Sequence, residues 1–82
     1  HPFEAENTAV KISAYKYASG GRRKWLIFAA NSETAEIEAC AVSGFTGGKL
    51  TDAQTGEPAD VSSGSITLGF ERFGHYIFTY EE

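Results

Sequence analysis

A few residue types in this chain could take part in catalysis. The chain has one cysteine, two histidines and eleven acidic residues. Nucleophilic catalysis needs a nucleophile, a base and an orienting group within hydrogen-bond reach. Cys40 and His75 fall in different predicted strands, and a lone cysteine in an alternating strand is typical of a small core residue. Glycoside hydrolysis needs one acid in an enclosed pocket, whereas Glu36 and Glu38 share one strand face and are expected to be solvated. We therefore predict no catalytic residues and no enzyme activity.

A second set of polar residues could bind calcium, which prefers oxygen ligands. Asp52, Glu57 and Asp60 lie close together, but their spacing matches no EF-hand loop. Asp52 and Thr55 are suited to accept backbone N–H groups in a turn, and Gly56 can supply a positive φ. A single cysteine leaves neither an internal disulfide nor a cysteine-based metal cluster. We expect a structural turn here, with no metal and no other cofactor.

Aromatic residues are the remaining candidates for function, because exposed rings stack on sugars or pack against proteins. The candidates are Tyr15, Tyr17, Trp25, Tyr76 and Tyr80. Tyr15 and Tyr17 are two residues apart, so they share the strand face opposite Val10 and Ile12. Tyr76, Phe78 and Tyr80 also share one face, and Trp25 is expected to join them in an outer aromatic surface. We favour docking on a protein over glycan binding, because exposed apolar patches usually mark protein contacts.

The elements that position these residues are predicted to be β-strands, since no window of three turns carries an i, i+3, i+4 apolar stripe. Gly20-Gly21 is typical of a tight hairpin. The apolar run at 25–30 favours a central strand covered on both faces. Strands separated by turns at this spacing predict an antiparallel β-sandwich. The seven predicted strands are 9–18, 24–31, 35–42, 49–52, 60–62, 65–71 and 75–80.

Size and charge limit the classes of partner. Eighty-two residues make at most one domain. The segment 1–8 is acidic, carries Pro2 and is expected to be a residual linker before a single domain at 9–82. A net charge of −4 argues against nucleic acid. The run at 25–30 is far too short to span a bilayer, so we expect no membrane partner. One cysteine does not distinguish a secreted protein from an intracellular one.

The order of several motifs resembles a known family. A strand ends in Asn31, the segment Asp52-Ala-Gln-Thr-Gly56-Glu57 follows, and an aromatic strand comes after Phe73-Gly74. This order resembles the small C-terminal β-sandwich that follows the catalytic barrel of many glycoside hydrolases, including amylase-like and β-galactosidase-like enzymes. The resemblance implies a non-catalytic accessory domain that packs against an upstream catalytic domain and stabilises it. Two alternatives remain, a carbohydrate-binding module for oligosaccharides and a small β-sandwich used in protein interaction.

Overall fold

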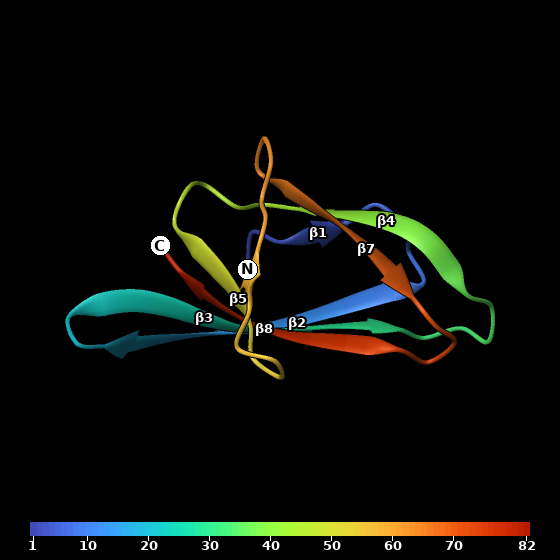
Figure 1. The fold of residues 1–82 in the computed structure, drawn as a ribbon, viewed down its shortest axis with the longest axis horizontal. Coiled ribbons are helices and arrows are strands. Elements are labelled where there is room, and N and C mark those ends of the chain that lie inside the picture. The colour runs from blue at the N-terminus through green and yellow to red at the C-terminus, as the bar shows by residue number, and fades with distance from the viewer.

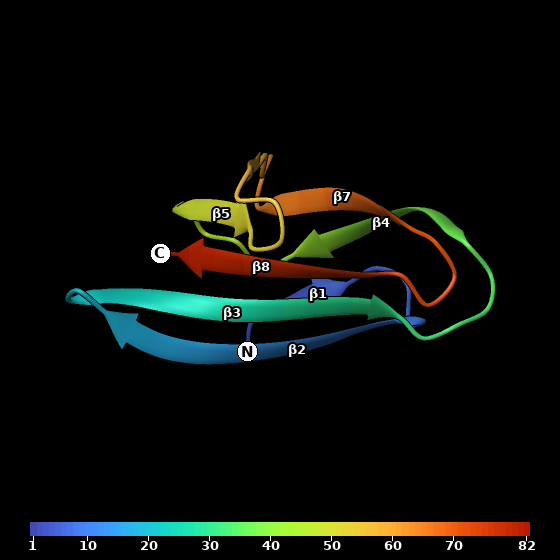
Figure 2. The ribbon, with the colours of Figure 1, turned by 60° about the horizontal axis from the view of Figure 1, so that its bottom comes forward.

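The computed structural model describes all 82 residues and contains eight β-strands and no helix. The strands are β1 (Glu4–Ala5), β2 (Val10–Ser19), β3 (Arg22–Asn31), β4 (Ile37–Ser43), β5 (Lys49–Asp52), β6 (Pro58–Ala59), β7 (Ser65–Phe70) and β8 (His75–Glu81). They form two antiparallel sheets, one in the order β1-β4-β7 and the other in the order β2-β3-β8-β5-β6. The two sheets pack against each other (Figures 1 and 2). The predicted antiparallel β-sandwich is confirmed. None of its elements is a helix that could cross a membrane.

The β2–β3 hairpin is the longest unit of the fold. Gly20 and Gly21 have φ values of 61° and 77°, as the two central residues of a type I′ turn require. Ser19 pairs with Arg22, and the register continues without interruption to Val10 and Asn31. The tip of the hairpin extends beyond the smaller sheet, on the left of Figure 1. The predicted tight turn is confirmed.

Alternation along the strands separates an inner face, directed at the other sheet, from an outer face. Val10 is buried whereas Tyr15 and Tyr17 are exposed, as the alternation in β2 predicted. On β7 the same alternation buries Ile66 and Leu68. The core consists of fifteen buried apolar side chains. These are Phe3, Val10, Trp25, Ile27, Ala29, Ile37, Cys40, Val42, Phe45, Leu50, Ile66, Leu68, Phe70, Phe78 and Tyr80.

The alternation predicted for β4 is wrong beyond its first residue. Strict alternation from Ile37 would also bury Ala39 and Ala41, but the buried residues are Ile37, Cys40 and Val42. The register with β7 shifts between Ile37 and Cys40. An irregularity of this kind adds a residue to one strand and reverses which side chains point inward. Cys40 therefore lies fully inside the core.

Two further expectations about the chain are corrected. The segment 1–8 belongs to the folded unit, because it contains β1 and the buried side chain of Phe3. The Phe3 ring packs edge-on against Trp25, with 5.2 Å between ring centroids. The short strand predicted at 60–62 is displaced to Pro58–Ala59, and Ser62 instead forms an isolated bridge with Ser65.

Candidate functional site

The outer face of the five-stranded sheet carries the exposed aromatic side chains. Strand register places its residues in rows that run across β2, β3, β8 and β5. The row nearest the hairpin tip is Tyr17, Lys24, Glu81 and Lys49. The next row is Tyr15, Leu26, Thr79 and Thr51. The third row is Ser13, Phe28 and Ile77.

The apolar patch of this face consists of Tyr15, Leu26, Phe28 and Ile77. Tyr15 is 61% exposed and Phe28 is 37% exposed. Their rings meet edge to face, with 6.2 Å between centroids and an interplanar angle of 83°. Leu26 and Ile77 are half-buried beside them. The run at 25–30 is central in its sheet, as predicted, and this chain itself covers only the inner of its two faces.

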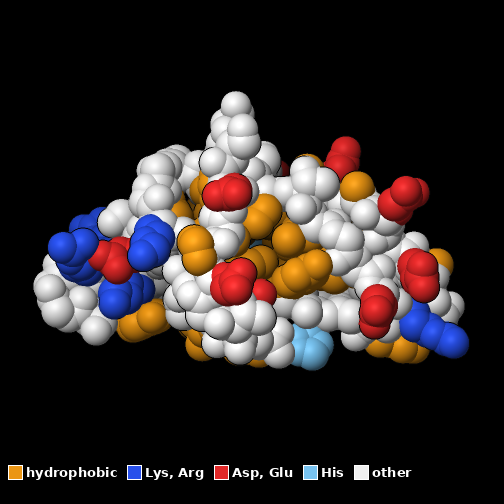
Figure 3. Space-filling model, in the orientation of Figure 1, with side chains coloured by type: hydrophobic (Ala, Val, Ile, Leu, Met, Phe, Trp, Pro, Cys, Tyr) orange, Lys and Arg blue, Asp and Glu red, His pale blue; other side chains and the backbone are white.

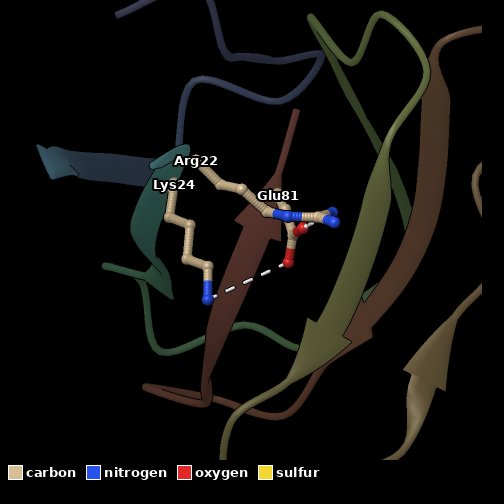
Figure 4. Close-up of polar contacts among 3 residues, drawn as sticks. All are labelled: Arg22, Lys24 and Glu81. Carbon is tan, nitrogen blue, oxygen red and sulfur yellow. Dashed lines mark hydrogen bonds and ion pairs between the residues drawn. The ribbon is translucent and has the colours of Figure 1, made fainter. Parts of the chain in front are cut away.

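A charged cluster borders the apolar patch at the hairpin tip. The Arg22 guanidinium lies 2.5 Å from Glu81, and the Lys24 ammonium lies 3.9 Å from the same carboxylate (Figure 4). The hydrogen bond from Arg22, aided by the positive charges of Arg22, Lys24 and Lys49, holds the pKa of Glu81 below its ordinary value. Figure 3 shows these basic side chains gathered around an acidic one at the hairpin end. Because the pair is exposed, it contributes little to stability.

Trp25 and Tyr80 were expected on the outer surface, and this expectation is wrong. They are 9% and 2% exposed, and they pair with each other on the inner face. The Trp25 indole Nε1 donates a 2.7 Å hydrogen bond to Glu82. The Tyr80 hydroxyl donates to the Gly47 carbonyl and accepts from the Thr46 amide at 3.1 Å. Tyr80 therefore ties the core to the backbone of residues 46–47, and Trp25 ties it to the carboxylate of Glu82.

Tyr76 is also an inner-face residue, and it is half-buried. Its ring stacks on Phe78, with 5.6 Å between centroids, and its hydroxyl donates a 2.6 Å hydrogen bond to the Gly69 carbonyl. Of the five aromatic residues named from the sequence, Tyr15 and Tyr17 are exposed on the outer face. Phe28 joins them there and was missed. Its position in an all-apolar strand of a one-core sandwich was the signal that could have identified it.

The residues considered for catalysis are not assembled into an enclosed site. Cys40 points into the core from the smaller sheet, whereas His75 is exposed on the far face of the larger sheet. An open hollow of about 650 Å³ is lined in part by Glu36, Glu71 and His75, all of them exposed. The general acid of a glycoside hydrolase lies in an enclosed pocket, and this hollow is open to solvent.

Two of the acidic residues considered for calcium, Asp52 and Glu57, belong to a hydrogen-bonded turn. The Asp52 carboxylate accepts hydrogen bonds from the Gln54 and Thr55 amides at 2.8 and 3.2 Å. The Thr55 hydroxyl accepts from the Glu57 amide at 3.2 Å, and Gly56 has a φ of 77°. The predicted structural turn is confirmed. No group of three or more His, Cys, Asp or Glu side chains is placed to hold a metal ion.

The arrangement of the outer face suits it for contact with another molecule. It offers two adjacent exposed rings, half-buried aliphatic side chains and a bordering group of cations. Comparison of the chain with protein-family models, with curated proteins and with solved structures finds no match. The case for a function therefore depends on the geometry of this face and on the sequence patterns described above.

Proposed function

We propose that this chain is a non-catalytic accessory domain whose outer face docks on a neighbouring domain of the same polypeptide and stabilises it. The observation that carries the proposal is the apolar patch, in which Tyr15 is 61% and Phe28 37% exposed. Exposed apolar surface of this kind usually marks a protein contact. Contacts between domains of one chain cover roughly 600–1,500 Å² and are more polar than obligate interfaces. A patch bordered by charged side chains fits that class of contact.

A glycoside hydrolase catalytic domain is the neighbour that the sequence resemblance implies. In that arrangement hydrolysis belongs to carboxylates of the neighbouring domain. The exposed positions of Glu36 and Glu38 accord with such a division of labour. The order of the sequence motifs is what supports a glycoside hydrolase domain as the neighbour.

The orientation of the rings favours docking over glycan binding. A platform that stacks on a sugar chain presents its rings as a flat row. Tyr15 and Phe28 stand at 83° to each other, and Trp25 is buried. An irregular patch of this kind can interlock with the side chains of a protein surface, whereas it offers only one ring face to a sugar.

Hydroxyl-radical footprinting tests the proposal. The oxidation rates of Tyr15 and Phe28 are measured in the 82-residue chain at low micromolar concentration and in the full polypeptide that its gene encodes. Docking predicts rates several-fold lower in the full polypeptide. Phe73 is the matched control, because it is 61% exposed like Tyr15 but lies outside the patch, and its rate should not change.

Two outcomes contradict docking. Equal oxidation rates for Phe28 in the two forms would show that no neighbouring domain covers the patch. Protection of Tyr15 in the 82-residue chain by added maltoheptaose or galactotriose would assign the face to glycan binding instead.

A further inference from the structure

β2 is the longest unpaired edge in the fold. The sheet orders leave β1, β7, β2 and β6 as end strands, with two, six, ten and two residues respectively. Natural proteins protect such edges by short strands, proline, bulges or charged side chains. β2 contains no proline, and its register with β3 has no irregularity. Its full length therefore presents backbone groups with no partner strand on one side.

The hairpin turn determines which backbone groups of β2 are free. Ser19 and Arg22 flank a two-residue turn, so they form a hydrogen-bonded pair. Alternation along an antiparallel ladder then directs the amide and carbonyl groups of every second residue away from β3. At the other end of the ladder the Ser32 amide donates a 2.9 Å bond to the Ala9 carbonyl. Ala9 is ten residues from Ser19, so this bond falls where the same alternation places a hydrogen-bonded pair. The residues whose outward amides have no partner are Ile12, Ala14, Lys16 and Ala18, since the outward amide of Val10 donates to Asn7.

The lysines of β2 do not protect this edge. The Lys16 ammonium lies over the Trp25 ring of its own sheet, 5.4 Å from the ring centroid. The Lys11 ammonium donates a 2.9 Å hydrogen bond to the Thr8 carbonyl. Both cations are thus engaged by their own chain, and the outward backbone groups of Ile12 and Ala14 lie between them.

We propose that a second copy of this chain pairs with β2 along this edge, antiparallel, about a two-fold axis at Tyr15. In this register Ile12 faces Ala18 of the second copy, and Ala14 faces Lys16. The four outward residues of each copy then form hydrogen-bonded pairs, and each pair exchanges two bonds. The two five-stranded sheets become one continuous sheet. This inference does not rest on the proposed docking function, because it concerns the sheet edge rather than its outer face.

Side-chain sizes and charges select this register and favour a second copy as the occupant. Apart from the two Tyr15 rings at the axis, each large side chain faces a small one across the interface, and no charge faces a like charge. The facing pairs are Lys11 with Ser19, Ile12 with Ala18, Ser13 with Tyr17, Ala14 with Lys16, and Tyr15 with its own counterpart. A register centred on Lys16 would oppose two lysines, which is destabilising. A register centred on Ala14 would require the amide of Val10, which already donates to Asn7 at 3.0 Å.

Sedimentation equilibrium of the 82-residue chain from micromolar to millimolar concentration tests the pairing. The register places Ser19 opposite Lys11 twice in the dimer, and both residues are exposed. Ser19→Glu should therefore tighten the dimer and Ser19→Lys should weaken it. We expect about a tenfold difference in dissociation constant between the two variants, reduced by high salt. Gln54→Glu and Gln54→Lys are the matched controls, since they change net charge equally at an exposed loop position.

Three results would overturn this inference. The first is a chain that stays monomeric at all concentrations. The second is a dimer whose dissociation constant changes equally between the Glu and Lys variants of Ser19 and between those of Gln54. The third is a dimer that Phe28→Ser abolishes while the Ser19 pair has no effect, which would assign self-association to the apolar patch. Failure of the docking footprint alone leaves this edge pairing standing, and failure of the edge pairing leaves docking standing.

Discussion

At the scale of single residues, Asn31 is the one buried polar side chain, with 2% of its surface exposed. Its amide nitrogen donates to the Ala35 and Glu71 carbonyls at 2.8 and 3.1 Å, and its oxygen accepts from the Glu33 amide at 3.1 Å. The Asn31 backbone amide also donates to the Gly74 carbonyl at 2.9 Å. One side chain thus joins the turn after β3 to the turn between β7 and β8. An asparagine at the end of a strand is typical of a turn, but the bond to Glu71 depends on tertiary packing.

Asn31→Leu should lower the free energy of unfolding by about 2 kcal/mol, because it leaves backbone groups without partners in a buried position. Urea denaturation followed by tryptophan fluorescence measures the change. Ser32→Ala is the control, since the Ser32 hydroxyl makes an exposed bond to the Ala9 carbonyl and its loss should cost less. Equal midpoints for the two variants would contradict the role given to Asn31.

The Glu81 carboxylate gives a prediction about pH. Its pKa is lowered by the hydrogen bond from Arg22 and by neighbouring cations. A depressed pKa in the folded state adds stability above the unfolded pKa, and this contribution is lost as the pH falls through the folded value. In an NMR titration Glu81 should therefore titrate below its ordinary value of 4.5. Arg22→Gln should move the pKa upward, while Arg72→Gln should leave it unchanged. A Glu81 pKa insensitive to Arg22→Gln would show that the ion pair does not form in solution.

At the scale of elements, alternation predicted the faces of β2 and β7 but not those of β3 and β4. At the start of β2, Val10 and Ile12 alternate with Lys11 and Ser13, so the pattern itself distinguishes the two faces. In β3 both faces are apolar, and nothing local indicates whether Trp25 or Leu26 points inward. The pairing of Trp25 with Tyr80 and the position of the second sheet decide it. In β4 the register shift reverses the pattern at Cys40, and β1 is too short to leave a pattern at all.

The β4 irregularity makes Cys40 inert. Its side chain has no exposed surface in the folded chain, so alkylation requires unfolding. Iodoacetamide should therefore label Cys40 at a rate that tracks global unfolding and rises steeply with urea. Ala39→Cys in a Cys40→Ala background is the comparison, because Ala39 is exposed and its thiol should react at once. Equally rapid labelling of both thiols would place Cys40 at the surface.

At the scale of the whole molecule, closure of the sandwich depends on the first residues of the chain. The Phe3 ring is 3% exposed and lies within about 6 Å of three other aromatic rings, those of Trp25, Phe45 and Tyr80. The acidic segment 1–8 was predicted to be a linker because its local sequence shows no strand pattern. The site that buries Phe3 exists only once the two sheets are assembled. The apolar patch also depends on the assembled structure, since Tyr15 and Phe28 become neighbours only through strand pairing.

Phe3→Ala should destabilise the chain by about 3 kcal/mol, as expected for removal of a buried aromatic ring. Thermal or urea unfolding measures the loss. Glu4→Ala tests whether the effect belongs to the core rather than to the segment, and it should have little effect because the Glu4 side chain is exposed. Unchanged stability in Phe3→Ala would return this segment to the status of a linker.

The central position of β8 has a consequence for synthesis on the ribosome. β8 is the latest strand in chain order, yet it lies between β3 and β5 and separates them in the sheet. Residues as distant as Lys24 and Glu81 pair there, whereas the β2–β3 hairpin closes over a two-residue turn. Loop closure costs more as the loop lengthens, so we expect the hairpin to form first and β8 to enter last. Until residues 75–81 leave the exit tunnel, β3 has an open edge on its other side, and the nascent chain remains open to aggregation or to chaperone binding.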